Sequence, residues 1–154
     1  MSESRNSRDT ETIDGVLITP LKIIDVPGGN VLHAMKKEDN GFNGFGEAYF
    51  STVEHKVIKG WKRHFEMTLN IVVPIGHIRF VLFDDRDSSQ TKGSYQEVSL
   101  SRNNYQRLTV PPMIWFAFEG IAKESSLLLN LASISHRKEE QENLSLDEIR
   151  YKWN

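Results

Sequence analysis

A succession of short β-rich runs, separated by turn signals, constrains the fold more than any other feature of this 154-residue chain. Glycine- and asparagine-containing turns, such as those at 27–30 and 39–41, lie between runs of aliphatic and aromatic residues. Strands at such even spacing predict an antiparallel sandwich or barrel. The expected strands are 15–21, 31–35, 46–51, 57–73 (two strands or one bent strand), 78–84, 94–100, 106–110, 114–118 and 126–133.

The two ends of the chain differ from this pattern. Residues 1–13 are mostly polar and predict a disordered N-terminal tail, because they carry too few apolar side chains to order themselves. Residues 14–136 predict a single all-β domain. Residues 137–154 predict a short C-terminal helical extension, in which Ser145 precedes Glu148 by three residues, as in a capping box.

Composition excludes several classes of function. Nineteen Lys and Arg against 21 Asp and Glu give a net charge of −2, which argues against a nucleic-acid partner. The absence of cysteine excludes disulfides and thiolate metal sites. No apolar run approaches the roughly 20 residues of a membrane helix, and no signal-peptide stretch begins the chain. We expect a soluble, cytoplasmic protein that binds neither membrane nor nucleic acid.

The most informative segment for chemistry is 58–70. If it is extended, alternation places Lys62, His64, Glu66, Thr68 and Asn70 in one row on one face. Inside a closed barrel such a row would line a pocket, where the nearby lysine lowers the pKa of His64 and favours the neutral, basic form. The alternative is that the row faces solvent on a half-exposed sheet, which is common.

Other polar and aromatic residues give weaker signals. Asp84 directly follows an apolar run and could orient a histidine, or it could belong to a solvated turn. Trp115 and Tyr49 could stack on a nucleobase, although aromatic residues more often belong to the core. The remaining candidates are cations that could bind phosphate, namely Lys59, Arg63, Arg86 and Arg107.

Spacing argues against a metal site. A single-metal cupin centre needs a His-x-His pair, then a Glu and a distant His. Lys62 occupies the first position of that pair, and a protonated amine is a poor ligand. After the prolines at 111–112 no histidine occurs before His136. Signatures of serine hydrolases, Walker loops and dinucleotide-binding folds are also absent.

Four segments, in order, resemble the dTDP-4-dehydrorhamnose 3,5-epimerases, a cupin family. Val57-Ile-Lys-Gly-Trp-Lys62 resembles their "VLRGLH", and 73–86 resembles their glycine turn, strand and "D-x-R". Leu100-Ser-Arg-Asn-Asn104 resembles "LS-x-x-N", and 110–118 resembles "IP-x-GFAHGF". The resemblance runs from about Gly46 to His136. It implies a cupin-type double-stranded β-helix (a jelly-roll barrel), a homodimer, and a nucleotide-diphospho-sugar bound at the barrel mouth.

The chemistry implied by this resemblance is epimerisation next to the C4 ketone of a 4-keto-6-deoxy sugar nucleotide, without metal or redox cofactor. A base removes the proton, an acid stabilises the enolate, and a proton returns on the other face. The family's base is the histidine of "RGLH", where this chain has Lys62. Its catalytic lysine aligns with Leu69, its catalytic tyrosine with Leu129, and the histidine of "AHGF" with Phe116.

We therefore predict that His64 is the general base or acid, that Lys62 stabilises the enolate, and that Asp84 orients the histidine. The predicted substrate-binding residues are Lys59, Arg63, Glu66, Asn70, Arg86, Tyr49 and Trp115. Three alternatives stay open: a catalytically inactive nucleotide-sugar-binding cupin, a structural cupin without a small ligand, and a 3,4-ketoisomerase-like cupin. In the last of these, the His-x-His pair has become Lys62-x-His64.

Overall fold

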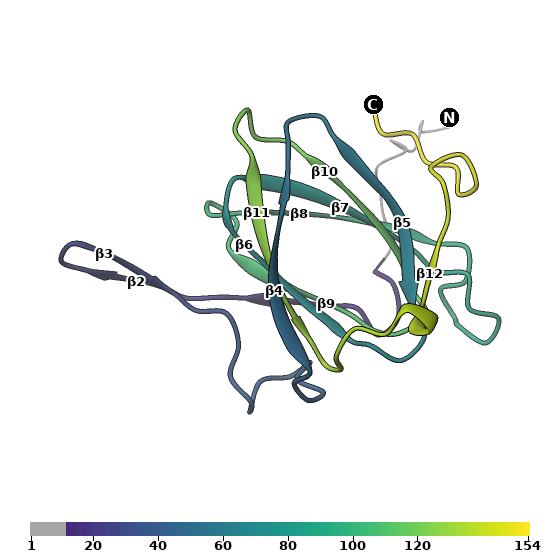
Figure 1. Cartoon of the computed structure of the whole chain (residues 1–154), viewed down its shortest axis with the longest axis horizontal. Coiled ribbons are helices and arrows are strands. Elements are labelled where there is room, and N and C mark those ends of the chain that lie inside the picture. The colour runs from purple at the N-terminus through teal and green to yellow at the C-terminus, as the bar shows by residue number, and fades with distance from the viewer. Residues whose placement is uncertain (1–11) are drawn as a thin grey trace, which may run out of the picture.

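The computed structural model describes residues 12–154, which form two five-stranded antiparallel sheets and a separate two-stranded hairpin (Figure 1). The first sheet has the order β1 (Leu17–Pro20), β9 (Gln106–Val110), β6 (Leu69–Ile75), β11 (Ser126–Ala132), β4 (Glu47–Val53). The second has the order β12 (Gln141–Asn143), β5 (Ile58–His64), β10 (Trp115–Gly120), β7 (His77–Phe83), β8 (Tyr95–Ser101). The hairpin comprises β2 (Ile23–Val26) and β3 (Gly29–Leu32), and η1 (Lys138–Glu140) is a single 3-10 turn.

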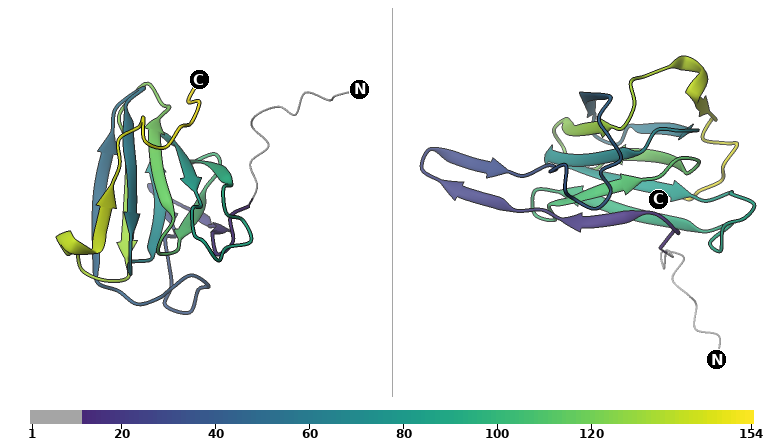
Figure 2. Two further views of the ribbon diagram at one scale, coloured as in Figure 1. Left: turned by 90° about the vertical axis from the view of Figure 1, so that its right-hand side faces the viewer. Right: turned by 90° about the horizontal axis from the view of Figure 1, so that it is seen from below.

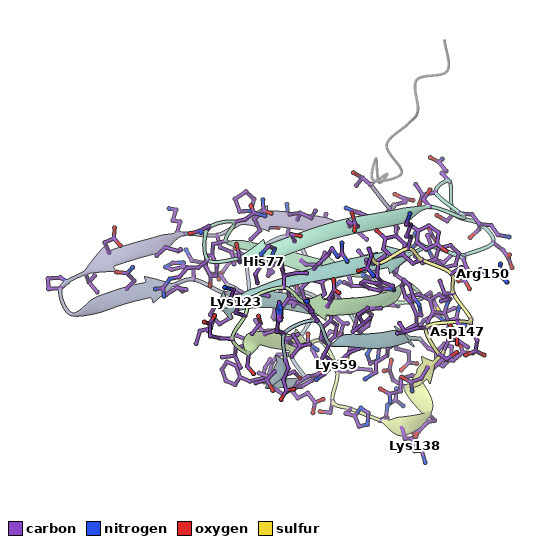
Figure 3. The ribbon with its side chains drawn as sticks, turned by 90° about the horizontal axis from the view of Figure 1, so that it is seen from above. Lys59, His77, Lys123, Lys138, Asp147 and Arg150 are labelled. Atoms are coloured by element: carbon purple, nitrogen blue, oxygen red, sulfur yellow. The ribbon has the colours of Figure 1, made fainter. Side chains whose placement is uncertain are left out.

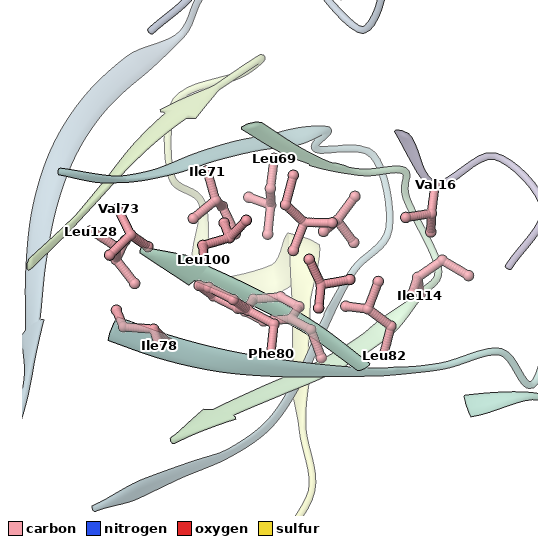
Figure 4. Close-up of a cluster of buried hydrophobic side chains, with 14 of the residues drawn as sticks. Val16, Leu69, Ile71, Val73, Ile78, Phe80, Leu82, Leu100, Ile114 and Leu128 are labelled. Atoms are coloured by element: carbon pink, nitrogen blue, oxygen red, sulfur yellow. The ribbon is translucent and has the colours of Figure 1, made fainter. Parts of the chain in front are cut away.

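The main core lies between the two sheets. Along each strand every second side chain points inward, so Ile78, Phe80 and Leu82 of β7 pack with Ile71 and Val73 of β6 (Figure 4). All five side chains are at most 3% exposed. The predicted all-β class is confirmed, and two antiparallel sheets around one core are consistent with the predicted cupin-type jelly roll.

A second apolar cluster covers the outer face of the second sheet. Trp61 and Trp115 are buried there beneath the C-terminal segment, which contributes Ile149 and Trp153. The C-terminal segment runs beside β5 in Figure 1. Its apolar residues at 144, 146, 149, 151 and 153 pack on the sheet, and the segment contains a turn at 146–148 and a bend at 149 rather than a helix.

The predicted C-terminal helical extension is therefore wrong. The Ser145 N–H does donate to the Glu148 carboxylate at 2.6 Å, and the Glu148 N–H donates to the Ser145 carbonyl at 3.1 Å. The first is one of the two bonds of a capping box, whereas the second closes a turn; no helix follows, and within residues 12–154 helical structure is limited to the three residues of η1. Packing on the sheet outweighs the local capping signal.

The strand predictions succeed over most of the barrel. The long run 57–73 divides into β5 and β6, with a turn at 65–68. The sequence did not predict β2, which pairs with β3 in a hairpin that stands away from the barrel (Figure 2). Residues 1–11 of the predicted tail lie outside the described residues, whereas Ile13 is fully buried and its N–H donates to Gln96 Oε1 at 2.9 Å.

The proposed boundaries at 14, 136 and 137 stay predictions. Residues beyond 136 pack on the barrel, because β12 pairs with β5 and the C-terminal segment covers Trp61. In residues 12–154, no helix has the length and apolar character that crossing a membrane requires.

Candidate active site

A cavity of about 180 Å³ opens between the two sheets. This volume is smaller than the roughly 300–1,000 Å³ of sites that hold drug-sized ligands, so it suits a sugar ring rather than a whole nucleotide sugar. The first sheet lines it with Tyr49, Ser51, Leu69, Ile71, Leu128 and Asn130. The second sheet lines it with Lys59, Gly60, Lys62, Phe116 and Phe118.

A β-bulge brings two lysines to the same wall. Lys62 is opposite Phe116 and Lys59 is opposite Phe118, so three steps along β5 match two steps along β10. A bulge of this kind changes which way the following side chains point. Lys59 and Lys62 therefore both line the cavity, although residues three apart on a regular strand face opposite sides.

The two lysines differ in environment. Lys59 Nζ donates to the carbonyl of Thr52 at 2.7 Å and lies 5.9 Å from the centroid of Phe118. Figure 3 labels Lys59 and shows it well separated from Lys138 on η1. Burial lowers the pKa of Lys62, and the charge of Lys59 lowers it further. Lys62 is thus closer than an ordinary lysine to a neutral amine that accepts a proton.

His64 shares the inward face of β5 but is not among the residues that line the cavity. Its ring stacks on Phe116 with centroids 6.3 Å apart and 16° between the planes, and Phe116 is the ring that reaches the cavity. The partner of His64 is Glu140 of η1, whose Oε1 bonds to Nδ1. Glu140 Oε2 also accepts the N–H groups of Glu66 and Met67, each at 3.0 Å.

The protonation states of His64 and Glu140 follow from this geometry. Burial lowers the pKa of His64 and outweighs the opposite effect of Glu140, which favours a neutral ring. Burial raises the pKa of Glu140, but the bonds from His64, Glu66 and Met67 outweigh it and keep the pKa below its ordinary range. Since an ionised carboxylate only accepts, Nδ1 of His64 carries the hydrogen and donates. No sequence feature distinguishes Glu140, which lies in the polar run 137–143.

The structure does not bring Asp84 to His64. The buried carboxylate of Asp84 accepts hydrogen bonds from Arg86 Nε at 2.9 Å, Ser89 Oγ at 2.6 Å and Thr91 Oγ1 at 2.7 Å. Burial opposes ionisation of Asp84, but these bonds outweigh it and hold its pKa below the ordinary range. Asp84 and Arg86 therefore hold the loop after β7 in place. The carboxylate beside His64 is that of Glu140, not the predicted Asp84.

Two predicted binding residues lie on the outer face of the second sheet. The Arg63 guanidinium is 4.6 Å from the Trp115 ring centroid, and Arg63 Nη1 lies 3.2 Å from Asp85 Oδ1. Trp115 Nε1 donates to Asp85 Oδ2 at 3.0 Å. Neither side chain lines the cavity, because both alternate outward with respect to Lys62 and Phe116.

Glu66 and Asn70 also lie away from the cavity. The turn at 65–68 interrupts the alternation on which their prediction depended. Exposed Glu66 pairs with Arg137, while Asn70 donates to the Gly41 carbonyl at 3.0 Å and accepts from Thr109 Oγ1 at 2.6 Å. Of the predicted site residues, the cavity brings together Lys59, Lys62 and Tyr49.

Asn130, which the sequence did not single out, completes the wall opposite Lys62. It lies directly across from Tyr49 in the β4–β11 pairing, and its Nδ2 donates to Tyr49 Oη at 2.8 Å. Burial raises the pKa of Tyr49, so its hydroxyl keeps its proton at neutral pH. In the sequence Asn130 is only a polar residue within an apolar run. Its role becomes visible in the folded structure, where it lies beside Tyr49.

The cavity thus combines an amine of reduced basicity on one sheet with a phenol and an amide on the other. Phe116, Phe118 and aliphatic side chains form the rest of its wall. Such a site can take a proton from a bound molecule and can offer hydrogen bonds to its oxygens. Across residues 12–154 there is no cluster of three His, Asp or Glu side chains arranged to hold a metal ion.

Comparison with solved structures identifies the family. A dTDP sugar isomerase from Desulfovibrio desulfuricans G20 superposes with a TM-score of 0.88 at 38% identity, and the match covers 92% of both chains. The chain belongs to the dTDP-sugar isomerase and 3,5-epimerase family. A 3,5-epimerase from Legionella pneumophila, solved with dTDP-4-keto-L-rhamnose, shares the fold with a TM-score of 0.77 at 20% identity over 88% of this chain and 75% of its own.

Curated relatives agree with this assignment. A probable low-salt glycan biosynthesis epimerase, Agl13 of Haloferax volcanii, is 33% identical over 84 residues, so the match spans about half of each chain, 54% of both. The spore coat polysaccharide biosynthesis protein SpsL of Bacillus subtilis is 24% identical over 92% of this chain and 90% of its own. No established family profile matches the chain. The relatives confirm the predicted resemblance and support a nucleotide-sugar epimerase or isomerase.

Proposed function

We propose that this protein is an epimerase or isomerase that moves a proton at a carbon next to the C4 ketone of a 4-keto-6-deoxy nucleotide sugar. One observation carries the proposal: Lys62, an amine of lowered pKa, faces a sugar-sized cavity between the sheets. Family membership supports the substrate class, since relatives of this fold have been solved with dTDP sugars.

We assign proton removal to Lys62 rather than to His64, because Lys62 reaches the cavity and His64 does not. The neutral amine takes the proton from the carbon beside the ketone, and the electrons of the C–H bond form the enolate. The ammonium that Lys62 becomes on taking the proton stabilises the charge of that enolate. His64, held by Glu140 and stacked on Phe116, positions the aromatic wall and is not a catalytic residue in this scheme.

The rest of the ligand lies outside the cavity in this proposal. A cavity of about 180 Å³ holds the sugar ring, and the diphosphate and nucleoside remain at its mouth. Lys59 is the cation we assign to the diphosphate, because it lines the cavity and is itself exposed. Tyr49 contacts the sugar from the opposite sheet.

The test is deuterium incorporation from heavy water into dTDP-4-keto-6-deoxyglucose, followed by NMR. The wild-type protein should incorporate deuterium next to the ketone, and Lys62→Met should slow this by about 100-fold or more. Lys123→Met, the same change at an exposed lysine, is the matched control and should keep the full rate. If His64→Asn stops exchange while Lys62→Met does not, the base is His64 and our assignment is wrong.

A second function is favoured by two residues in the cavity. Leu69 and Phe116 line it at the positions where the family resemblance places a catalytic lysine and a histidine. A catalytically inactive nucleotide-sugar-binding protein would bind the keto sugar in calorimetry and show no deuterium incorporation. A 3,4-ketoisomerase would instead move the ketone, which NMR of the product detects.

We also propose a homodimer, as the family resemblance implies. The support is the β2–β3 hairpin, which extends away from the barrel and exposes Ile24, Val26 and Val31 by 42–48% (Figure 2). Light scattering should give twice the chain mass. Aspartate at Ile24 and Val31, which pair across the hairpin, should give the monomer. The cytoplasmic location rests on composition and stays a prediction.

A further inference from the structure

Tyr49 and Asn130 form a hydrogen-bonded polar pair on one wall of the cavity. They are directly opposite each other on β4 and β11, and their neighbours on that sheet's part of the wall include the apolar Leu69, Ile71 and Leu128. Asn130 is 2% exposed and Tyr49 is 39% exposed. The pair thus has one member fixed in the interior and one at the accessible part of the cavity.

The direction of their hydrogen bond leaves one donor and one acceptor unused. Asn130 Nδ2 donates to Tyr49 Oη at 2.8 Å, so the phenol oxygen accepts and the phenol hydrogen is free to donate into the cavity. Asn130 Oδ1 is buried and has no hydrogen-bond partner. A buried acceptor without a partner is unfavourable by about 1–3 kcal/mol and is uncommon, which points to a bound ligand as its partner.

We propose that this pair recognises an α-hydroxy ketone: the Tyr49 hydroxyl donates to the ketone oxygen, and Asn130 Oδ1 accepts from the hydroxyl on the adjacent carbon. The inference rests on the proposed function and specifies its substrate. In a 4-keto sugar the matching groups are the C4 ketone and the C3 hydroxyl. A sugar that lacks either group leaves one member of the pair without its partner, so the pair determines specificity.

The position of the pair also suits the reaction. Tyr49 and Asn130 belong to the first sheet and Lys62 to the second, so the bound sugar ring lies between them. When Lys62 removes the neighbouring proton, negative charge collects on the ketone oxygen that Tyr49 contacts. A hydrogen bond to that oxygen strengthens as the enolate forms and therefore lowers the barrier.

The experiment measures binding of three sugar nucleotides by calorimetry, in the Lys62→Met background to prevent turnover. The probes are dTDP-4-keto-6-deoxyglucose, its 3-deoxy analogue, and dTDP-6-deoxyglucose, in which a hydroxyl replaces the ketone. Tyr49→Phe should reduce the preference for the ketone about fivefold and keep the preference for the 3-hydroxyl. Asn130→Leu should reduce the preference for the 3-hydroxyl by a similar factor.

Asn130→Asp separates recognition from a merely structural role. Its carboxylate accepts from Tyr49, which turns the phenol hydrogen away from the ligand. This variant should therefore lose the ketone preference and keep the 3-hydroxyl preference, the same pattern as Tyr49→Phe. Tyr95→Phe, the same change at a tyrosine that does not line the cavity and whose hydroxyl donates to the Arg150 carbonyl, is the matched control and should change neither preference. Thermal unfolding checks that each variant is folded.

The outcomes distinguish this inference from the proposed function. If Tyr49→Phe and Asn130→Asp keep the ketone preference of the parent protein, the inference is wrong. This holds even if the wild-type protein exchanges deuterium. If the preferences shift as expected but the wild-type protein never exchanges deuterium, recognition stands and the proposed catalysis fails.

Discussion

Replacing Glu140 by alanine should destabilise the folded protein by about 3–5 kcal/mol. The carboxylate is 3% exposed and accepts three hydrogen bonds, from His64 Nδ1 and from the N–H groups of Glu66 and Met67. Alanine removes every acceptor and leaves three donors without a partner, of which those of His64 and Met67 are buried. Each buried donor without a partner costs about 1–3 kcal/mol, and the three are coupled, so the sum is an upper bound.

Equilibrium unfolding in urea, followed by circular dichroism at pH 7, measures this loss. The unfolding midpoint should fall while the slope with urea stays the same. Glu142→Ala is the control, because Glu142 lies two residues on, pairs with Arg63 and has a side chain 42% exposed; it should cost about 1 kcal/mol or less. A loss below about 1 kcal/mol for Glu140→Ala would refute the idea that this carboxylate secures the end of β5.

Lowering the pH should remove the contribution of Glu140 to the stability of the folded protein. The pKa of Glu140 is lowered in the folded state, so between that value and the ordinary value of 4.5 the unfolded chain binds more protons than the folded one. The contribution of Glu140 to stability is complete above the ordinary value and is lost as the pH falls through the folded one. The stability gap between wild type and Glu140→Ala should therefore narrow in acid; a gap that stays constant down to pH 3 would contradict the assignment.

Two further predictions concern the pH dependence of deuterium exchange and the stability of the turn between β6 and β7. The exchange rate should rise with pH toward a midpoint below the ordinary lysine value of 10.5, because the neutral form of Lys62 is the base; a midpoint below the ordinary histidine value of 6.5 would point to His64 instead. Gly76→Ala should destabilise by about 2 kcal/mol or more, because Gly76 has φ +88° and an added Cβ would lie 2.2 Å from Ser126 Oγ. Gly93→Ala, at φ +89° with nothing within 4 Å, should cost less in the same unfolding assay; equal losses would show that the close contact is irrelevant.

Much of the barrel could be predicted from the sequence because strand alternation is a local property. The runs that became β7, β9, β10 and β11 alternate between core and outer face, and their turn residues mark the ends. Lys62 entered the prediction through strand alternation, in one row with His64, and Lys59 entered it as a cation that could bind phosphate. Alternation alone would have put them on opposite faces, and only the bulge opposite Phe116 and Phe118 brings them together.

The residues that sequence reasoning missed or misplaced depend on long-range contacts. Asn70 was expected in the same row as His64, but the turn at 65–68 resets the alternation and leaves Asn70 against Gly41. Glu140 comes 76 positions after His64, and nothing local distinguishes it from neighbouring acidic residues. Asn130 becomes informative only when β11 pairs with β4 and places it beside Tyr49.

A crystal structure of Lys62→Met with dTDP-4-keto-6-deoxyglucose is the most direct test of where the chemistry occurs. The sugar ring should lie between position 62 and Tyr49, with the thymidine diphosphate outside the cavity and near Lys59. A sugar bound elsewhere, for instance in the separate cavity lined by His33 and Arg107, would contradict the assignment of this site.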